Sequence, residues 1–257
     1  LASEMVLNWP IRAEDADLYA GQWTVTLAAV DGAGNYTSGS CMNATVQSKE
    51  DFSFDNADVN VRLVYAEGVD EITAVTEAVD AAIDRWKTIW APYGLTPKVR
   101  ITTGDIDADL PYAGDGSEDI YSITLDSYED EITLVIGETI DGGSEYLGVA
   151  GSIPGTLTAN TRSAVVLGWV ASAGLDGSFS DLDISIMGET MAHEVGHYMG
   201  LFHPVEQTWS AWDACEDTPD CRSRRQCEDQ LGDNLMFPSP VCDFDDCLEQ
   251  DQLSAVQ

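Results

Sequence analysis

Basic residues are scarce in this sequence, and their scarcity excludes several classes of partner. The chain has 257 residues with Lys+Arg 11 against Asp+Glu 46, which gives a formal net charge of -35 at pH 7. A surface with this charge repels the phosphates of nucleic acids and the head groups of anionic lipids. We therefore expect neither nucleic acid nor an acidic membrane as a partner.

Long hydrophobic runs are also missing. No stretch approaches the ~18 consecutive apolar residues that a membrane-spanning helix requires, so we expect no membrane insertion. Hydrophobic residues nevertheless make up 44% of the chain, enough to fill the core of one large domain, or of one medium domain with a fragment. The sequence does not open at Leu1 as a signal peptide does, and we expect a mature or trimmed product.

Two explanations of the acidity stay open. An acidic surface keeps a protein soluble in high salt, where like-charge repulsion is screened, and carboxylates also build calcium sites. Lysine occurs only at Lys49, Lys87 and Lys98, and the carboxylates are scattered along the chain. These two features favour the first explanation and a saline habitat.

One acidic loop, at residues 104–118, bears on the calcium explanation. Asp105, Asp107 and Asp109 resemble the start of a calcium-binding loop. An EF-hand needs glycine at its sixth position, however, and Leu110 stands there. We therefore interpret the segment as a solvated loop.

All 3 histidines of the chain lie in one stretch with the form H-E-x-x-H-x-x-G-x-x-H. A helix places His193 and His197 one turn apart on the same face, so that both imidazoles reach one cation, while Glu194 lies beside that cation without binding it. Gly200 lets the chain leave the helix through a positive-φ turn, and His203 returns as a third ligand. Three neutral imidazoles with a fourth position open to water are typical of catalytic zinc. Histidines packed on an apolar helix face are the alternative, but the confinement of all three to this motif favours zinc.

The 6 cysteines indicate an oxidising environment. They lack paired C-x-x-C spacing and the histidines are already committed, so we expect disulfides in an exported, extracellular protein. Six cysteines allow ~15 connectivities, and the sequence does not choose among them. An odd number lies near the C-terminus, which leaves Cys41 either paired with one of these or free. The C-terminal cysteines are Cys215, Cys221, Cys227, Cys242 and Cys247.

The first part of the chain, residues 1–50, resembles a small β module. Residues 22–30 and 36–46 have the composition of strands, and residues 31–35 between them form a turn. This pair is too small to fold alone. It is either the end of a β-sandwich domain or an N-terminal extension packed on the domain that follows.

The second part, residues 51–257, alternates predicted strands with helices and indicates an α/β fold. One helix has apolar residues at helical spacing, among them Trp86 and Trp90, which we expect in the core. A second helix carries the histidine motif, and Asp181 or Asp183 is expected to cap it. We expect strands at 59–65, 98–102, 131–136 and 163–170, and helices at 72–90 and 184–199.

The segment 146–155 contains the glycines and the proline of an exposed edge strand. There the free backbone groups of Gly148, Val149, Ala150 and Gly151 could pair with another extended chain. An ordinary loop is the alternative. The position between the core strands and the histidine helix favours the edge strand.

With these motifs the chain resembles a metzincin zinc endopeptidase, and within that clan most of all the pappalysin family. The extended histidine motif is the first signature. Residues 234–238 (Asn-Leu-Met-Phe-Pro) resemble the methionine turn of these enzymes, and residues 217–219 (Asp-Thr-Pro) resemble a triplet of pappalysins. The resemblance covers roughly residues 57–257. It implies a catalytic domain at 51–257 with a twisted mixed sheet, a backing helix and an active-site helix, divided into an upper subdomain (51–203) and a disulfide-rich lower subdomain (204–257).

The resemblance also implies roles for further residues. Met236 would form an apolar floor for the three imidazoles, with a plain core position as the alternative. Asp217 and Thr218 lie in a region that holds calcium in such enzymes, and a turn or capping role fits them equally. Pro238 stands where many relatives have a tyrosine that approaches zinc, so we assign no tyrosine here. Pro204, after the third histidine, is reminiscent of serralysins.

The implied function is the hydrolysis of peptide bonds in protein or peptide substrates by a secreted zinc endopeptidase. Zinc would lower the pKa of water to about 7 and polarise the scissile carbonyl, and Glu194 would pass a proton from the water to the leaving amine. The substrate would lie extended along the edge strand. Two other classes stay open: an inactive binding or adhesion module with the same fold, and a small-molecule hydrolase that uses the same three histidines.

Overall fold

The computed structural model describes residue 24 and residues 57–173, 178–213, 217–243 and 246–253. All of these except Thr24 belong to one compact unit. Apart from Thr24, the predicted β module at residues 1–50 lies outside the described residues, so the division of the chain into residues 1–50 and 51–257 stays a prediction. No helix among the described residues is long and apolar enough to cross a membrane.

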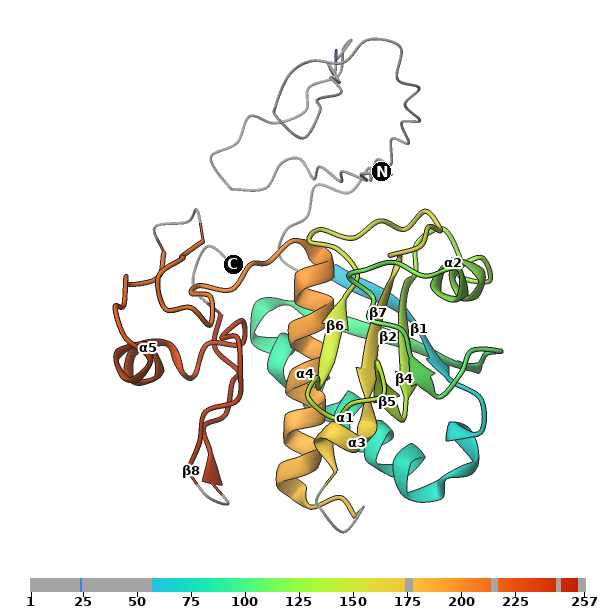
Figure 1. Ribbon diagram of the computed structural model, residues 1–257, viewed down its shortest axis with the longest axis horizontal. Helices are drawn as coiled ribbons and strands as arrows, with labels where there is room; N and C mark the ends of the chain where they lie inside the picture. The colour runs from blue at the N-terminus through green and yellow to red at the C-terminus, as the bar shows by residue number, and fades with distance from the viewer. Residues whose placement is uncertain (1–23, 25–56, 174–177, 214–216, 244–245, 254–257) are drawn as a thin grey trace. The chain divides into compact units, whose positions relative to one another are not determined.

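A five-stranded sheet organises the described part of the chain (Figure 1). Neighbouring strands run parallel, except that β6 at one edge runs antiparallel to β7. This mixed sheet, combined with helices, confirms the α/β fold class. The strands in spatial order are β2 (Leu95–Thr103), β1 (Ala57–Tyr65), β4 (Ile132–Gly137), β7 (Ala164–Gly168) and β6 (Gly148–Ala150).

Burial on both faces explains the apolar composition of the inner strands. Every residue of β4 and β7 is buried, as is typical of parallel strands that are covered on both sides. The strand predicted at 163–170 ends earlier, because the chain turns into a short helix after Gly168. The strand predicted at 98–102 is longer, because β2 pairs with β1 along its whole length.

Two long helices, α1 (Thr73–Trp90) and α4 (Asp181–Met199), pack against each other. Gly188 of α4 permits their close approach, since a Cβ there would lie 2.7 Å from a backbone oxygen of α1. Trp86 and Trp90 are buried as predicted, with ring centroids 5.1 Å apart. The shorter elements are η1 (Val69–Glu71), η2 (Ala91–Tyr93), α2 (Glu118–Thr124), α3 (Trp169–Ser172), α5 (Arg224–Leu231), the pair β3 (Asp109–Leu110) with β5 (Thr139–Ile140), and the pair β8 (Cys242–Asp243) with β9 (Asp246–Cys247).

The interpretation of residues 104–118 as a solvated loop is wrong in part. Leu110 is fully buried and pairs within β3 against β5. Asp109 accepts hydrogen bonds from the Thr139 hydroxyl and from the Gly142 N–H, both at 2.6 Å. The apolar side chain that argued against a calcium loop therefore anchors this segment to the core.

The predicted cap of the histidine helix is also corrected. Helix α4 begins at Asp181, and Ser180 is its N-cap. The Ser180 hydroxyl accepts the Asp183 N–H at 3.3 Å, and the Asp183 carboxylate accepts the Ser180 N–H at 2.7 Å. This reciprocal capping box satisfies two backbone donors that the first turn would leave free. Asp183 therefore supports the cap without being the N-cap residue itself.

Disulfides tie the C-terminal part together, as expected. Cys221 bonds to Cys227 and Cys242 bonds to Cys247. Cys41 and Cys215 lie outside the described residues, so the partner of Cys41 stays a prediction. A second apolar cluster forms around the first disulfide and consists of Val205, Cys221, Cys227, Leu231 and Phe237.

Candidate metal centre

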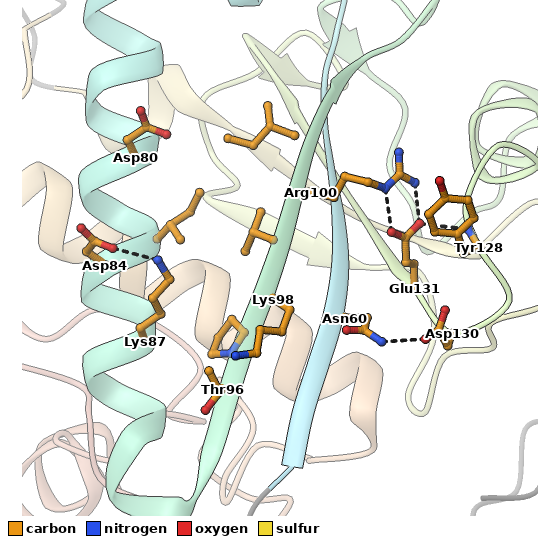
Figure 2. Close-up of a pocket in the computed structure, with 14 residues that line it drawn as sticks. Asn60, Asp80, Asp84, Lys87, Thr96, Lys98, Arg100, Tyr128, Asp130 and Glu131 are labelled. Carbon is orange, nitrogen blue, oxygen red and sulfur yellow. Dashed lines mark hydrogen bonds and ion pairs between the residues drawn. The ribbon is translucent and has the colours of Figure 1, made fainter.

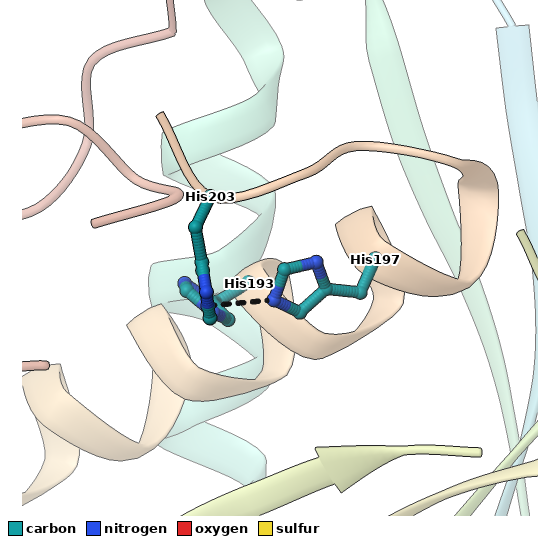
Figure 3. A group of neighbouring side chains, drawn as sticks. All are labelled: His193, His197 and His203. Carbon is teal, nitrogen blue, oxygen red and sulfur yellow. Dashed lines mark hydrogen bonds between the residues drawn. The ribbon is translucent and has the colours of Figure 1, made fainter. Parts of the chain in front are cut away.

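Helix α4 and the loop after it bring the three histidines together (Figure 3). His193 and His197 lie one turn apart, and Gly200 ends the helix in the left-handed region with φ 116°. The chain then folds back so that His203 faces the other two imidazoles. One ligand atom from each of the three lies within 4.8 Å of the others. Within the described part of the chain this is the one such group of histidine, cysteine or acidic residues.

The spacing of the Nε2 atoms fits a tetrahedral metal ion. Nε2 of His203 lies 3.3 Å from Nε2 of His193 and 3.0 Å from Nε2 of His197. Zinc–nitrogen bonds of about 2.0–2.1 Å place neighbouring nitrogens of a tetrahedral site about 3.3 Å apart. The three imidazoles are therefore arranged as ligands of one ion.

A separate acceptor holds the other nitrogen of each ring. Nδ1 of His193 lies 2.6 Å from the Leu235 carbonyl, and Nδ1 of His197 lies 2.7 Å from the Leu201 carbonyl. Nδ1 of His203 lies 3.2 Å from the Glu206 carboxylate. These acceptors place the proton on Nδ1 and leave Nε2 free to bind metal. Burial, together with the neighbouring rings, lowers the pKa of His193 well below its ordinary value. Burial, together with the His203 ring, lowers the pKa of His197 to about 4. These two rings are thus neutral at pH 7, as metal ligands must be.

The side chain of Glu194 extends from the histidine helix α4 to the edge strand β6. Its Oε2 accepts the Ala150 N–H at 2.8 Å. Burial raises the pKa of Glu194 to about 7, although the Ala150 hydrogen bond opposes the shift. Gly148 allows the close approach, because a Cβ there would lie 2.8 Å from Cγ of Glu194 and 2.9 Å from Cγ2 of Thr190. A carboxyl group poised to exchange a proton near neutral pH suits general acid–base chemistry.

The predicted edge strand is confirmed, although it is shorter than segment 146–155. The flanking residues Leu147 and Gly151 are hydrogen-bonded to β7. Because an antiparallel ladder alternates, the backbone of Val149 faces β7, and the backbones of Gly148 and Ala150 face the open edge. The open edge therefore presents the backbone groups of Gly148 and Ala150 next to Glu194.

Met236 lies directly beneath the histidine helix. It is fully buried, and its sulfur lies 3.1 Å from the place that a Cβ of Gly196 would occupy. The Asn234 side chain accepts the Met236 N–H at 2.8 Å and shapes the turn. The role of Met236 as a floor for the imidazoles stays a prediction, and the neighbouring Leu235 carbonyl adds a contact to His193 that the sequence did not indicate.

Asp217 and Thr218 are half-buried in a bend that follows an undescribed segment. Among the described residues, Asp217 belongs to no group of three histidine, cysteine or acidic side chains that could hold a metal ion. Calcium at these residues stays a prediction.

An open hollow lies along β2, at the edge of the sheet opposite β6 (Figure 2). Cations line it, but carboxylates already neutralise them. Arg100 donates to both oxygens of Glu131 at 2.8 and 2.6 Å, and Lys87 pairs with Asp84 at 2.9 Å. We assign this hollow no role in metal binding.

The sequence matches no family model and no curated protein. Among solved structures, the chain is similar to archaemetzincin from Methanopyrus kandleri, with 17% identity over 56% of this chain and 75% of that one and a TM-score of 0.40. It is also similar to metalloproteinase-II from Bacteroides fragilis, with 15% identity, 59% and 44% coverage and a TM-score of 0.40. Myroilysin aligns with 12% identity, 76% and 86% coverage and a TM-score of 0.32.

Proposed function

We propose that this protein is a zinc-dependent endopeptidase that acts on proteins or peptides outside the cell. The observation that carries the proposal is the combination of three convergent imidazoles with one adjacent carboxylate. The Nε2 atoms of His193, His197 and His203 meet at ligand spacing, and Glu194 links them to an open strand edge. A structural zinc site closes all four positions with protein ligands, whereas this site offers three.

The three histidines and Glu194 have different roles in the proposed reaction. Zinc bound by the three histidines would supply a Lewis acid that acidifies water and polarises a carbonyl group. Glu194 uses Oε2 to hold the Ala150 N–H, and its Oε1 accepts a proton from the attacking water. The same oxygen would then return that proton to the leaving amine.

The open edge of β6 selects an extended peptide as the substrate. Gly148 offers an N–H and a carbonyl, and Ala150 offers its carbonyl, because the Ala150 N–H is held by Glu194. A peptide that adds to this edge as a further strand places its backbone beside Glu194. A small molecule gains nothing from such a row of backbone groups, which favours a peptide substrate.

Two disulfides support an extracellular site of action, since such bonds persist in oxidising compartments. We keep the narrower resemblance to pappalysins as part of the proposal, with residues 217–219 as its signature. Calcium near Asp217 and Thr218 belongs to the same proposal.

Digestion of casein tests the proposal. Purified protein loaded with one zinc ion per chain should cleave casein, and 1,10-phenanthroline should stop the cleavage. Glu194→Gln should lower turnover by about 10²–10⁴-fold and leave the zinc content unchanged. Glu129→Gln, an exposed carboxylate elsewhere on the chain, is the matched control and should keep full turnover.

The opposite result has a clear meaning. A protein that binds zinc one to one and cleaves neither casein nor a peptide library would be a binding module with this fold. Full turnover in Glu194→Gln would also overturn the role assigned to that carboxylate.

A further inference from the structure

A short C-terminal segment, Glu249–Leu253, crosses the turn that carries Met236, and we call it the C-terminal strap. The Gln252 carbonyl accepts the Leu235 N–H at 2.7 Å, and the Gln252 N–H donates to the Asp233 carbonyl at 3.1 Å. Residues 234 and 252 form a parallel bridge. The strap is thus bonded to the backbone of the turn itself.

The Gln250 side chain fixes both ends of that turn. Gln250 is buried, with 6% of its surface exposed. Its Nε2 donates to the Gly232 carbonyl at 3.2 Å, before the turn, and to the Ser239 carbonyl at 2.9 Å, after it. One buried amide therefore sets the distance across the turn.

Arg85 of α1 ties the strap to the histidine helix. Its guanidinium lies 2.8 Å from Glu189, 3.4 Å from Glu249 and 3.8 Å from Asp251. Glu189 is nearly buried and lies one turn before His193 on α4. A single arginine therefore bridges α1, α4 and the strap.

The hydrogen bonds between the strap and the turn reach the metal centre through one peptide group. The Leu235 peptide receives the strap through its N–H, and its carbonyl holds Nδ1 of His193 at 2.6 Å. Groups that orient a metal-binding histidine change metal affinity when they are lost, because they fix the tautomer and the direction of the ring.

We propose that the C-terminal strap is a positioning device for the metal centre, with Gln250 and Arg85 as its positioning residues. It holds the Leu235 carbonyl where His193 must point its Nδ1–H. The inference rests on the proposed zinc site, but it requires no peptidase activity.

Zinc affinity of the full-length protein tests the strap. Competition with a chromogenic chelator should show about 10–100-fold weaker zinc binding in Gln250→Met, which keeps the size of the side chain and removes both donors. Arg85→Met should weaken zinc binding in the same direction, and Arg85→Lys should recover part of the loss. In the zinc-loaded protein, the NMR signal of the His193 Nδ1–H should shift in Gln250→Met.

Arg100→Met is the matched control. It breaks the Arg100–Glu131 ion pair on β2, at the edge of the sheet away from β6, and should lower the stability of the protein with zinc affinity unchanged. Wild-type zinc affinity in both Gln250→Met and Arg85→Met would overturn the inference. If Gln250→Met does not fold, Arg85→Met decides alone, since its side chain does not contact the turn. Tight zinc binding without hydrolysis in the wild type would overturn the proposed function and leave the strap test intact.

Discussion

The two sides of the metal centre are stabilised in different ways. His193 and His197 come from α4, which is embedded in the large apolar cluster of the sheet and α1. The side chains of Leu235 and Met236 join the same large cluster, but their turn lies in the C-terminal part, where the strap bonds its backbone and two disulfides and a small cluster hold the flanking chain. The comparison teaches that burial in one core positions both sides, whereas the carbonyl that supports His193 also requires long-range backbone hydrogen bonds.

The largest change in stability should come from the core on the helix side. Trp86→Ala leaves a cavity under α1 and should lower the free energy of unfolding by about 3–5 kcal/mol. Urea denaturation with a chelator present measures this without a contribution from zinc. Trp212→Ala should cost less, because 42% of that residue's surface is already exposed to solvent. Equal losses in the two variants would contradict a stability dominated by this core.

The disulfides should matter next on the C-terminal side. Replacing Cys221 and Cys227 with serine should cost about 2 kcal/mol through loop entropy, together with the burial of both sulfurs. The pair Cys242 and Cys247 closes a loop of similar length, but Cys242 is exposed, so its removal should cost less. Thermal unfolding of the two double variants gives the order, and the reverse order would show that burial of the first pair adds nothing.

Acid should weaken the sheet through Glu131. Its hydrogen bonds from Arg100 lower the pKa of this carboxyl, and burial only partly opposes them. Because the folded pKa lies below the unfolded one, this stabilisation is complete above the unfolded value of about 4.3 and is lost as the pH falls through the folded value. Glu131→Gln should therefore lose about 1–2 kcal/mol at pH 7 and show a shallower decline between pH 5 and pH 3. Denaturant titrations across that range, with Glu129→Gln as control, measure the slope, and parallel slopes would refute the coupling.

The smallest effect should arise at the start of α4. Ser180→Ala removes the capping box and should cost about 1 kcal/mol. Ser223→Ala removes the corresponding cap of α5 on the C-terminal side, where the Ser223 hydroxyl accepts the Gln226 N–H at 3.3 Å. Amide hydrogen exchange should accelerate only in the first turn of the helix that loses its cap. Faster exchange throughout α4 would show that its anchoring depends on the cap and not on the core.

Local patterns predicted much of the sheet and the histidine helix. The alternation of apolar strands and helices located β1, α1, β4 and α4 to within a few residues, because the side chains that a strand or helix buries recur at a regular spacing in the sequence. The same logic failed at Leu110, where one apolar side chain in an acidic loop pairs with β5. Nothing in the neighbouring residues records that distant partner.

The sequence by itself determined which residues form the candidate metal centre, because helical periodicity and one glycine turn place His193, His197 and His203 together with few other contacts required. Only the tertiary structure decided what holds those rings and the carboxylate beside them. The acceptors for Nδ1 include the backbone carbonyls of Leu201 and Leu235, and the donor to Glu194 is the backbone N–H of Ala150. Every residue has a backbone carbonyl, and every residue except proline has an N–H. Which of these groups forms a given hydrogen bond is therefore decided by how the chain folds, and the residue types do not predict it.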